Sequence, residues 1–124
     1  MKKEYDIVPV PKPRMTRRDK WLNPARPGVA RYRNFCLECT LKKVHMPMSG
    51  GHVTFVLPMP DSWSKRHKDI HDHRHHFQTP DLDNLIKALL DALFEDDKEV
   101  CDLRATKIWG REGKIIVETQ DHLA

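Results

Sequence analysis

The sequence has no long apolar segment, no leader-like start and no even set of cysteines. No apolar run approaches the roughly 18 residues that a membrane-spanning helix needs. The chain does not open on a charged and then apolar signal segment, so we expect a soluble, cytoplasmic protein without a membrane partner. Three cysteines cannot all pair, which argues against a disulfide framework.

Internal repeats and domain boundaries are also absent, and 124 residues fit one domain, so we expect residues 1–124 to form a single unit. The charge is uneven. Ten of the 22 Lys and Arg residues lie in residues 1–33 with only three acids, so this part carries a net +7 and the remainder −3. A basic N-terminal part joined to a mildly acidic body suits a nuclease, because cations contact phosphates and carboxylates bind metal.

Hydrophobic periodicity predicts, in chain order, an edge strand at 5–10, a helix at 29–45, a strand at 52–59, a helix at 82–95, and strands at 100–109 and 114–119. The prolines and basic residues at 11–28 predict a long basic loop, and the polar, His-rich stretch at 61–78 predicts an exposed loop. The order strand-helix-strand-helix-strand-strand indicates an α+β domain with a mixed sheet packed by two helices.

Two aspartates stand two residues apart where the helix at 82–95 begins. If the backbone is extended there, Asp81 and Asp83 point the same way, and both carboxylates can reach one hard cation. Lys87 lies four residues after Asp83 and shares a helix face with it. The pattern is therefore compatible with a metal site that has a cation beside it.

A second acidic pair, Asp96-Asp97, follows the helix. A helix from 83 to 95 is about 20 Å long at 1.5 Å per residue. Asp97 therefore lies far from Asp81 along one helix axis. A single site with all three acids requires the chain to return, or a second subunit to supply one of them, so the sequence raises the question of a dimer.

A purely structural interpretation of these acids stays open at this point. One aspartate can serve as a helix N-cap. Asp83, Lys87 and Asp91 can form a solvated salt ladder, at about 0.2–0.5 kcal/mol per pair. Asp96 and Asp97 can form a polar turn. Spacing alone does not decide between this interpretation and a metal site.

The motif and its surroundings resemble a known family. The residues PDLDNLIK at 80–87, the apolar helix after them and EDDKEV at 95–100 are similar to the RusA family of Holliday junction resolvases, which occur in phages and prophages. The segments at 11–21, 58–65 and 107–110 support the resemblance, which covers nearly the whole chain. Thr79 is a departure, because phage relatives often carry Lys before the Pro-Asp pair.

The resemblance implies a Mg²⁺-dependent endodeoxyribonuclease, with Mn²⁺ as a substitute, that acts as a homodimer. Its implied role is to resolve four-way DNA junctions by paired symmetric nicks in DNA recombination and repair, in the cytoplasm of a bacterial or phage-infected cell. It implies that Asp81, Asp83 and Asp97 are catalytic and bind the metal. Lys87 is the implied catalytic lysine, and Asp96 is not expected to be a ligand.

Cations in the basic loop are the expected DNA contacts, together with one histidine before the motif: Lys12, Arg14, Arg17, Arg18, Lys20, Arg26 and His76. Trp21 suits stacking on an unpaired base at a branch point. The cations Lys107, Arg111 and Lys114 of the last hairpin would extend this surface. A merely solubilising arm is the structural alternative.

Cys36 and Cys39 have the spacing of a half zinc site. On a helix they lie on or near the apolar face, where free cysteines pack as small hydrophobic residues, and we favour that role. Three other functions stay open: a non-catalytic branched-DNA-binding module of the same fold, a metal nuclease acting on other branched DNA, and a zinc-stabilised interaction protein.

Overall fold

The computed structural model describes residues 1–119, except the side chain of Asp97. In chain order it contains β1 (Lys2–Tyr5), the 3-10 helix η1 (Arg17–Lys20), α1 (Pro27–Leu41), β2 (Gly51–Pro58), α2 (Lys65–His71), α3 (Leu82–Leu93), the 3-10 helix η2 (Asp97–Glu99), β3 (Leu103–Gly110) and β4 (Lys114–Thr119). This is the predicted α+β architecture with an additional helix, α2.

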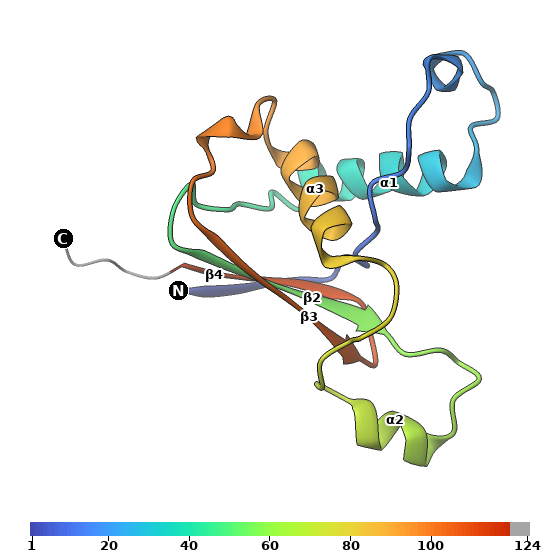
Figure 1. Ribbon diagram of the computed structural model, residues 1–124, viewed down its shortest axis with the longest axis vertical. Coiled ribbons are helices and arrows are strands. Elements are labelled where there is room, and N and C mark those ends of the chain that lie inside the picture. The colour runs from blue at the N-terminus through green and yellow to red at the C-terminus, as the bar shows by residue number, and fades with distance from the viewer. Residues whose placement is uncertain (120–124) are drawn as a thin grey trace.

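The four strands form one mixed sheet in the order β1-β4-β2-β3. β2 pairs in parallel with β3, where Val53 lies opposite Ala105, and antiparallel with β4, where Val53 lies opposite Val117. β1 pairs antiparallel with β4. Because β2 and β3 are parallel, the chain between them has to cross over, and both α2 and α3 lie on that crossover (Figure 1).

One face of the sheet is covered by α1 and α3 (Figure 1). Alternate residues of β2 point to this face, and Val53, Phe55 and Leu57 are all buried. The helices supply the other half of the core from the stripes that the sequence predicts, namely Tyr32, Phe35 and Cys39 of α1 and Leu85, Ala88, Leu89 and Leu90 of α3.

Most predicted elements are confirmed with small shifts at their ends. α3 begins at Leu82 as predicted, β4 has the predicted bounds, and β2 is displaced by one residue. α1 begins earlier than predicted because Pro27 occupies the first turn, where a missing N–H does no harm. It ends before Lys43, whose φ of 54° is left-handed.

The strand predicted at 5–10 is wrong in position. β1 covers Lys2–Tyr5, and the Ile7 N–H then donates back to the Tyr5 carbonyl oxygen at 2.9 Å. That tight turn ends the pairing with β4. Ile7 and Pro9 are nevertheless buried, so the apolar pattern marks core residues outside the strand.

The prediction of exposed loop throughout 61–78 is also wrong, because α2 forms there. The hydroxyl of Ser64 accepts the His67 N–H at 3.1 Å and caps the helix. The ring of Trp63 stacks on His67 with centroids 3.9 Å apart. This helix has little apolar periodicity, so its stabilising contacts are not visible in the hydrophobic pattern. Within the predicted basic loop, η1 likewise adds one short turn.

Across residues 1–119, none of the helices has the length and apolar character required to cross a membrane.

Candidate active site

The Asp81-x-Asp83 motif lies at the start of α3. Asp81 is the N-cap, with extended backbone (φ −68°, ψ 142°), whereas Asp83 is in the first helical turn. The idea that both acids lie in extended backbone is therefore wrong for Asp83. Asp81 makes no side-chain capping bond, and Asp83 Oδ1 accepts the Asn84 N–H at 3.0 Å. Both carboxylates are exposed at the positive end of the helix dipole, with oxygen atoms free for a cation.

The salt ladder that was the main structural alternative does not form. Asp91 pairs with Lys12, with Nζ and Oδ2 3.2 Å apart, rather than with Lys87. Among the described side chains, neither Asp83 nor Lys87 takes part in an ion pair. Lys87 is exposed one turn after Asp83, so its ammonium group is available to a ligand held at the motif.

A hollow of about 410 Å³ opens beside the motif. The Lys12 N–H donates to the Asn84 carbonyl oxygen at 3.3 Å, so the start of the basic segment at 11–26 is attached to the first turn of α3. A polyanion that reaches the motif therefore passes beside this basic segment. The walls of the hollow come from both segments: Pro11, Thr79, Pro80, Asp81 and Asn84.

Lys107 fixes the segment that leads into the motif. Its Nζ donates to the carbonyl oxygen of Pro80 at 2.7 Å and to that of Gln78. Lys107 lies opposite Phe55 in the β2–β3 register, so its side chain emerges on the helix-covered face. Sequence reasoning placed Lys107 on a DNA surface instead. Its alternation with the apolar Trp109 along one strand is the signal that indicates the core-facing side.

The other two cations of the last hairpin also have partners within the chain. Arg111 pairs with Asp69 and Asp72 at the end of α2. Lys114 lies within 3.9 Å of carboxylates among the first six residues. These contacts connect the hairpin to its neighbours, whereas the sequence suggested that both cations extend a DNA surface.

The basic arm, residues 11–26, folds around one buried acid. Asp19 is 1% exposed and accepts hydrogen bonds from the N–H and hydroxyl of Thr16 at 2.6 and 3.1 Å and from Arg26 Nε and Nη2, each at 2.8 Å. The Arg26 bonds, and next the Thr16 N–H, hold the pKa of Asp19 well below its usual range. Arg33 donates to the Asp19 carbonyl oxygen at 3.0 Å. Sequence reasoning missed this role, although Thr16-x-x-Asp19 has capping-box spacing.

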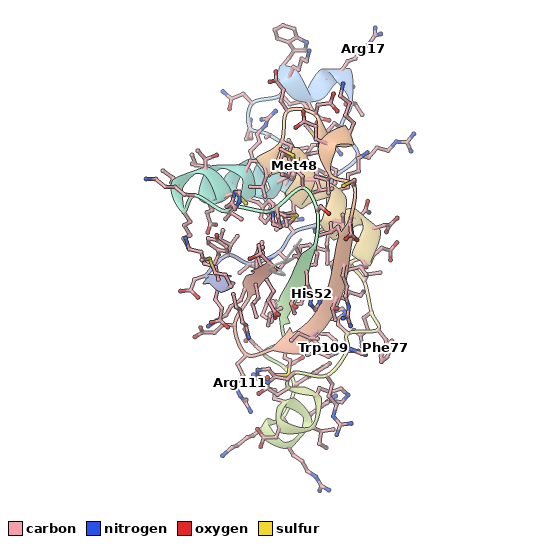
Figure 2. All side chains as sticks on the ribbon, turned by 90° about the vertical axis from the view of Figure 1, so that its left-hand side faces the viewer. Arg17, Met48, His52, Phe77, Trp109 and Arg111 are labelled. Atoms are coloured by element: carbon pink, nitrogen blue, oxygen red, sulfur yellow. The ribbon has the colours of Figure 1, made fainter. Side chains whose placement is uncertain are left out.

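The predicted DNA contacts of the arm divide into two groups. Lys12 and Arg26 have internal partners and hold the arm in place. Trp21 is 83% exposed near the arm's tip, and Figure 2 shows Arg17 at one end of the long molecule. The remaining arm cations are exposed and form no ion pair among the described side chains: Arg14, Arg17, Arg18 and Lys20.

His76, expected to contact phosphate, is instead only 4% exposed. Its ring lies 3.8 Å from that of Trp109, centroid to centroid, and its Nδ1 accepts the Gln78 N–H at 3.2 Å. Burial, and then the nearby Lys107 charge, lowers the pKa of His76, which keeps the ring neutral at neutral pH. In this structure the ring positions Gln78 and has no open surface for a phosphate.

A comparison with protein families now bears on these residues. The family model described as endodeoxyribonuclease RusA matches residues 4–120. This chain belongs to the RusA family. Membership confirms the resemblance predicted from the motif, and it makes the chain a nuclease of a family that implies Holliday junction resolvase activity. No curated protein matches the sequence significantly.

The three acids that the resemblance implies as metal ligands are divided between the two ends of α3. Asp81 and Asp83 lie at its start, whereas Asp97 begins η2 beyond its other end. Twelve helical residues span about 18 Å. The Asp97 side chain lies outside the described residues. Among the side chains that are described, no three His, Cys, Asp or Glu residues are grouped so that they could hold a metal.

The two α1 cysteines of this RusA chain occupy packing positions. Cys39 is buried, and burial raises the pKa of its thiol to about 12. Cys36 is partly buried beside the same core. Both side chains thus pack against the apolar core, where free cysteines behave as small hydrophobic residues, which supports the packing role over the zinc alternative.

We expect Asp19→Asn to loosen the arm of this RusA chain at neutral pH, because the amide carries no charge for Arg26. Trypsin should cleave the arm faster than in wild type. The exposed Asp61→Asn is the matched control, since Asp61 forms no ion pair among the described side chains. Equal cleavage rates for wild type and Asp19→Asn would contradict the role assigned to the pair.

The same pair predicts a pH dependence of stability. The pKa of Asp19 in the folded chain lies below its unfolded value of about 3.9. The pair therefore stabilises the fold above that pH and loses its contribution as the pH falls through the folded pKa. Urea unfolding from about pH 7 down to about pH 3 should show the free-energy difference between wild type and Asp19→Asn shrinking on the acid side.

Proposed function

We propose that this chain is a Mg²⁺-dependent, structure-selective endonuclease that resolves four-way DNA junctions by paired symmetric nicks, in DNA recombination and repair. The observation that carries the proposal is the pair of exposed carboxylates, Asp81 and Asp83, without ion-pair partners among the described side chains, beside the root of a basic arm. Membership of the RusA family gives the reaction class.

Asp81, Asp83 and Asp97 are the proposed metal ligands. The donor set fits Mg²⁺, with Mn²⁺ as a substitute, because carboxylate oxygens are the ligands that hard divalent cations prefer. When bound, the metal activates a water molecule and neutralises charge on the scissile phosphate. The free oxygens of Asp81 and Asp83 support this assignment, since neither carboxylate is neutralised by a described cation.

Lys87 is the proposed catalytic lysine. It is exposed on α3 one turn beyond Asp83 and makes no ion pair with a described side chain. Its ammonium group can therefore approach a phosphate held at the motif and stabilise the negative charge that develops on its oxygens. An ion pair between Lys87 and an acid of the same chain would have reduced that stabilisation.

The arm is the proposed DNA-binding element. Arg14, Arg17, Arg18 and Lys20 are exposed cations on a segment that Asp19, Lys12 and Arg26 hold in shape, so little ordering is needed on binding. Neutralising phosphates releases counterions and gives affinity without sequence preference. Such binding suits an enzyme that selects branched DNA by shape.

A homodimer is the proposed assembly, working in the cytoplasm of a bacterial or phage-infected cell. Two symmetric nicks need two active sites related by a two-fold axis. The position of Asp97, beyond the far end of α3 from Asp81, favours a second copy that completes each site.

Nicking of a synthetic four-way junction tests the proposal. Wild type with Mg²⁺ should nick the junction in preference to linear duplex. We expect Asp83→Asn and Lys87→Ala each to slow nicking by roughly 100-fold or more, because each removes charge aimed at the transition state. Asp61→Asn and Lys2→Ala, away from the motif, should cut at the wild-type rate. If Lys87→Ala cleaves the junction at the wild-type rate, Lys87 has no part in the mechanism.

Preference among substrates separates the remaining alternatives. Faster cutting of flaps or other branched DNA than of four-way junctions would favour the broader metal nuclease. Tight junction binding without nicking, at any Mg²⁺ concentration, would favour the non-catalytic module.

Binding of Mg²⁺ should stabilise the folded chain, because the metal relieves repulsion between the Asp81 and Asp83 carboxylates. A ligand at 100 times its Kd adds about 2.7 kcal/mol to the free energy of unfolding. We therefore expect the Tm to rise on titration with Mg²⁺ in wild type and to stay nearly constant in Asp83→Asn. An equal rise in both proteins would show that the stabilising ion binds elsewhere.

Salt dependence tests the arm. Each phosphate contact contributes about 0.9 to the slope of log affinity against log salt on duplex DNA. Arg17→Ala with Arg18→Ala should flatten the slope for junction binding by up to about 1.8. The double variant Lys2→Ala with Arg104→Ala, on β1 and β3, removes the same number of positive charges away from the arm and is the control. An unchanged slope in the arm variant would exclude these arginines as phosphate contacts.

A further inference from the structure

A stack of aromatic and imidazole rings fills the space between α2 and the end of β3. The Trp63 and Trp109 rings lie 4.8 Å apart, His67 stacks on Trp63 at 3.9 Å, and His76 packs on Trp109 at 3.8 Å. The two tryptophans come from segments far apart in the sequence. This stack therefore attaches α2 to the sheet and builds a rigid aromatic wall.

A hollow of about 420 Å³ opens against this wall. Its size is within the range of small-molecule sites, about 300–1,000 Å³. Phe77 is one of its lining residues and is 90% exposed. Figure 2 shows Phe77 near Trp109. An aromatic ring left this open in water has apolar surface to bury against a partner. The complete lining is Trp63, His67, His71, Arg74, His75, Phe77, Gln78 and Trp109.

The exposed ring of Phe77 is carried by a fixed backbone. The segment before it pairs with the edge of β3, where the Trp109 N–H donates to the Arg74 carbonyl oxygen at 2.9 Å and the His76 N–H to that of Lys107 at 3.1 Å. After it, the Lys107 Nζ holds the next carbonyl group. Phe77 is thus presented to solvent by bonds on both sides, which lowers the entropy cost of binding a partner.

Arg74 lies on the rim of the hollow and is one of several cations in this part of the chain. The nearby carboxylates of Asp69 and Asp72 are paired with Arg111. Four cations on α2 and the rim form no ion pair among the described side chains: Lys65, Arg66, Lys68 and Arg74. Aromatic walls with a cationic rim complement a ligand that has a flat ring and a phosphate.

The hollow is also close to the catalytic motif along the chain. Asp81 is the fourth residue after Phe77, a span of at most about 14 Å even if fully extended. Lys107 donates to the carbonyl oxygens of both Gln78 and Pro80, so one side chain holds the backbone beside Phe77 and the backbone beside Asp81. A nucleotide at Phe77 would lie within a few nucleotides of a phosphate at the motif.

We propose that this hollow holds one unpaired nucleobase of the DNA substrate, stacked on Phe77, with Arg74 near its phosphate. Every base has a π-face, so such stacking tolerates any sequence and favours strands that are not fully paired. The inference rests on the proposed function for its substrate, DNA, and adds a second contact.

The test uses two four-way junctions, one fully paired and one with a single unpaired 2-aminopurine nucleotide at the branch. Full-length wild type in Ca²⁺ should quench the 2-aminopurine fluorescence by stacking and should prefer the unpaired junction. We expect Phe77→Ala to lose the quenching and to weaken that preference about tenfold. Phe77→Trp should retain both.

Ile70→Ala is the matched control, since Ile70 is 49% exposed on α2 and does not line the hollow. Quenching at the wild-type level in Phe77→Ala, or an equal loss in Ile70→Ala, would overturn the proposal. If Phe77→Ala retains the quenching but sediments with a lower mass than wild type, the Phe77 ring contacts a second copy of the chain. That result would also overturn the proposal.

Failure of the inference and failure of the proposed function give different results. Asp83→Asn should quench like wild type and not nick. If wild type nicks junctions but Phe77→Ala quenches normally, the base site is wrong and the nuclease assignment stands. If wild type quenches through Phe77 but never nicks, the base site stands and the proposed reaction is wrong.

Discussion

The parallel pairing of β2 with β3 is the constraint on which the rest of the molecule depends. Parallel strands cannot be joined by a tight turn, so the chain between them has to leave one end of the sheet and return to the other. That crossover carries α2, the Asp81–Asp83 motif, α3 and η2. The candidate site is therefore placed by the sheet, although no strand residue contributes one of its acids.

Backbone groups at the edge of β3 determine where the motif lies on that crossover. An edge strand presents unpaired N–H and carbonyl groups, and residues 73–76 satisfy several of those of β3. Lys107 then reaches past this added segment to the carbonyl oxygens of Gln78 and Pro80. The route into α3 is thus fixed by hydrogen bonds before the helix begins. The same bonds expose Phe77.

Cations in this chain fall into two groups that composition cannot separate. Arg26 is held by Asp19, Lys12 by Asp91, and Arg111 by two carboxylates near α2. These cations keep segments in place. The arm and α2 each also carry several cations that form no ion pair among the described side chains, and these are available to a polyanion.

The sequence by itself determined the elements whose burial is periodic and local. The stripe of α3 and the apolar run of β2 predict those elements within a residue or two. The residues at 80–87 and 95–100 carry the resemblance to the RusA family, which the family model confirms. Only the tertiary structure decided the partners of each polar group. The pairing of Lys107, the burial of His76, the role of Asp19 and the formation of α2 all depend on contacts between segments far apart in the chain or on caps and ring stacking. Hydrophobic periodicity reports which residues avoid water, not which donor a given acceptor meets.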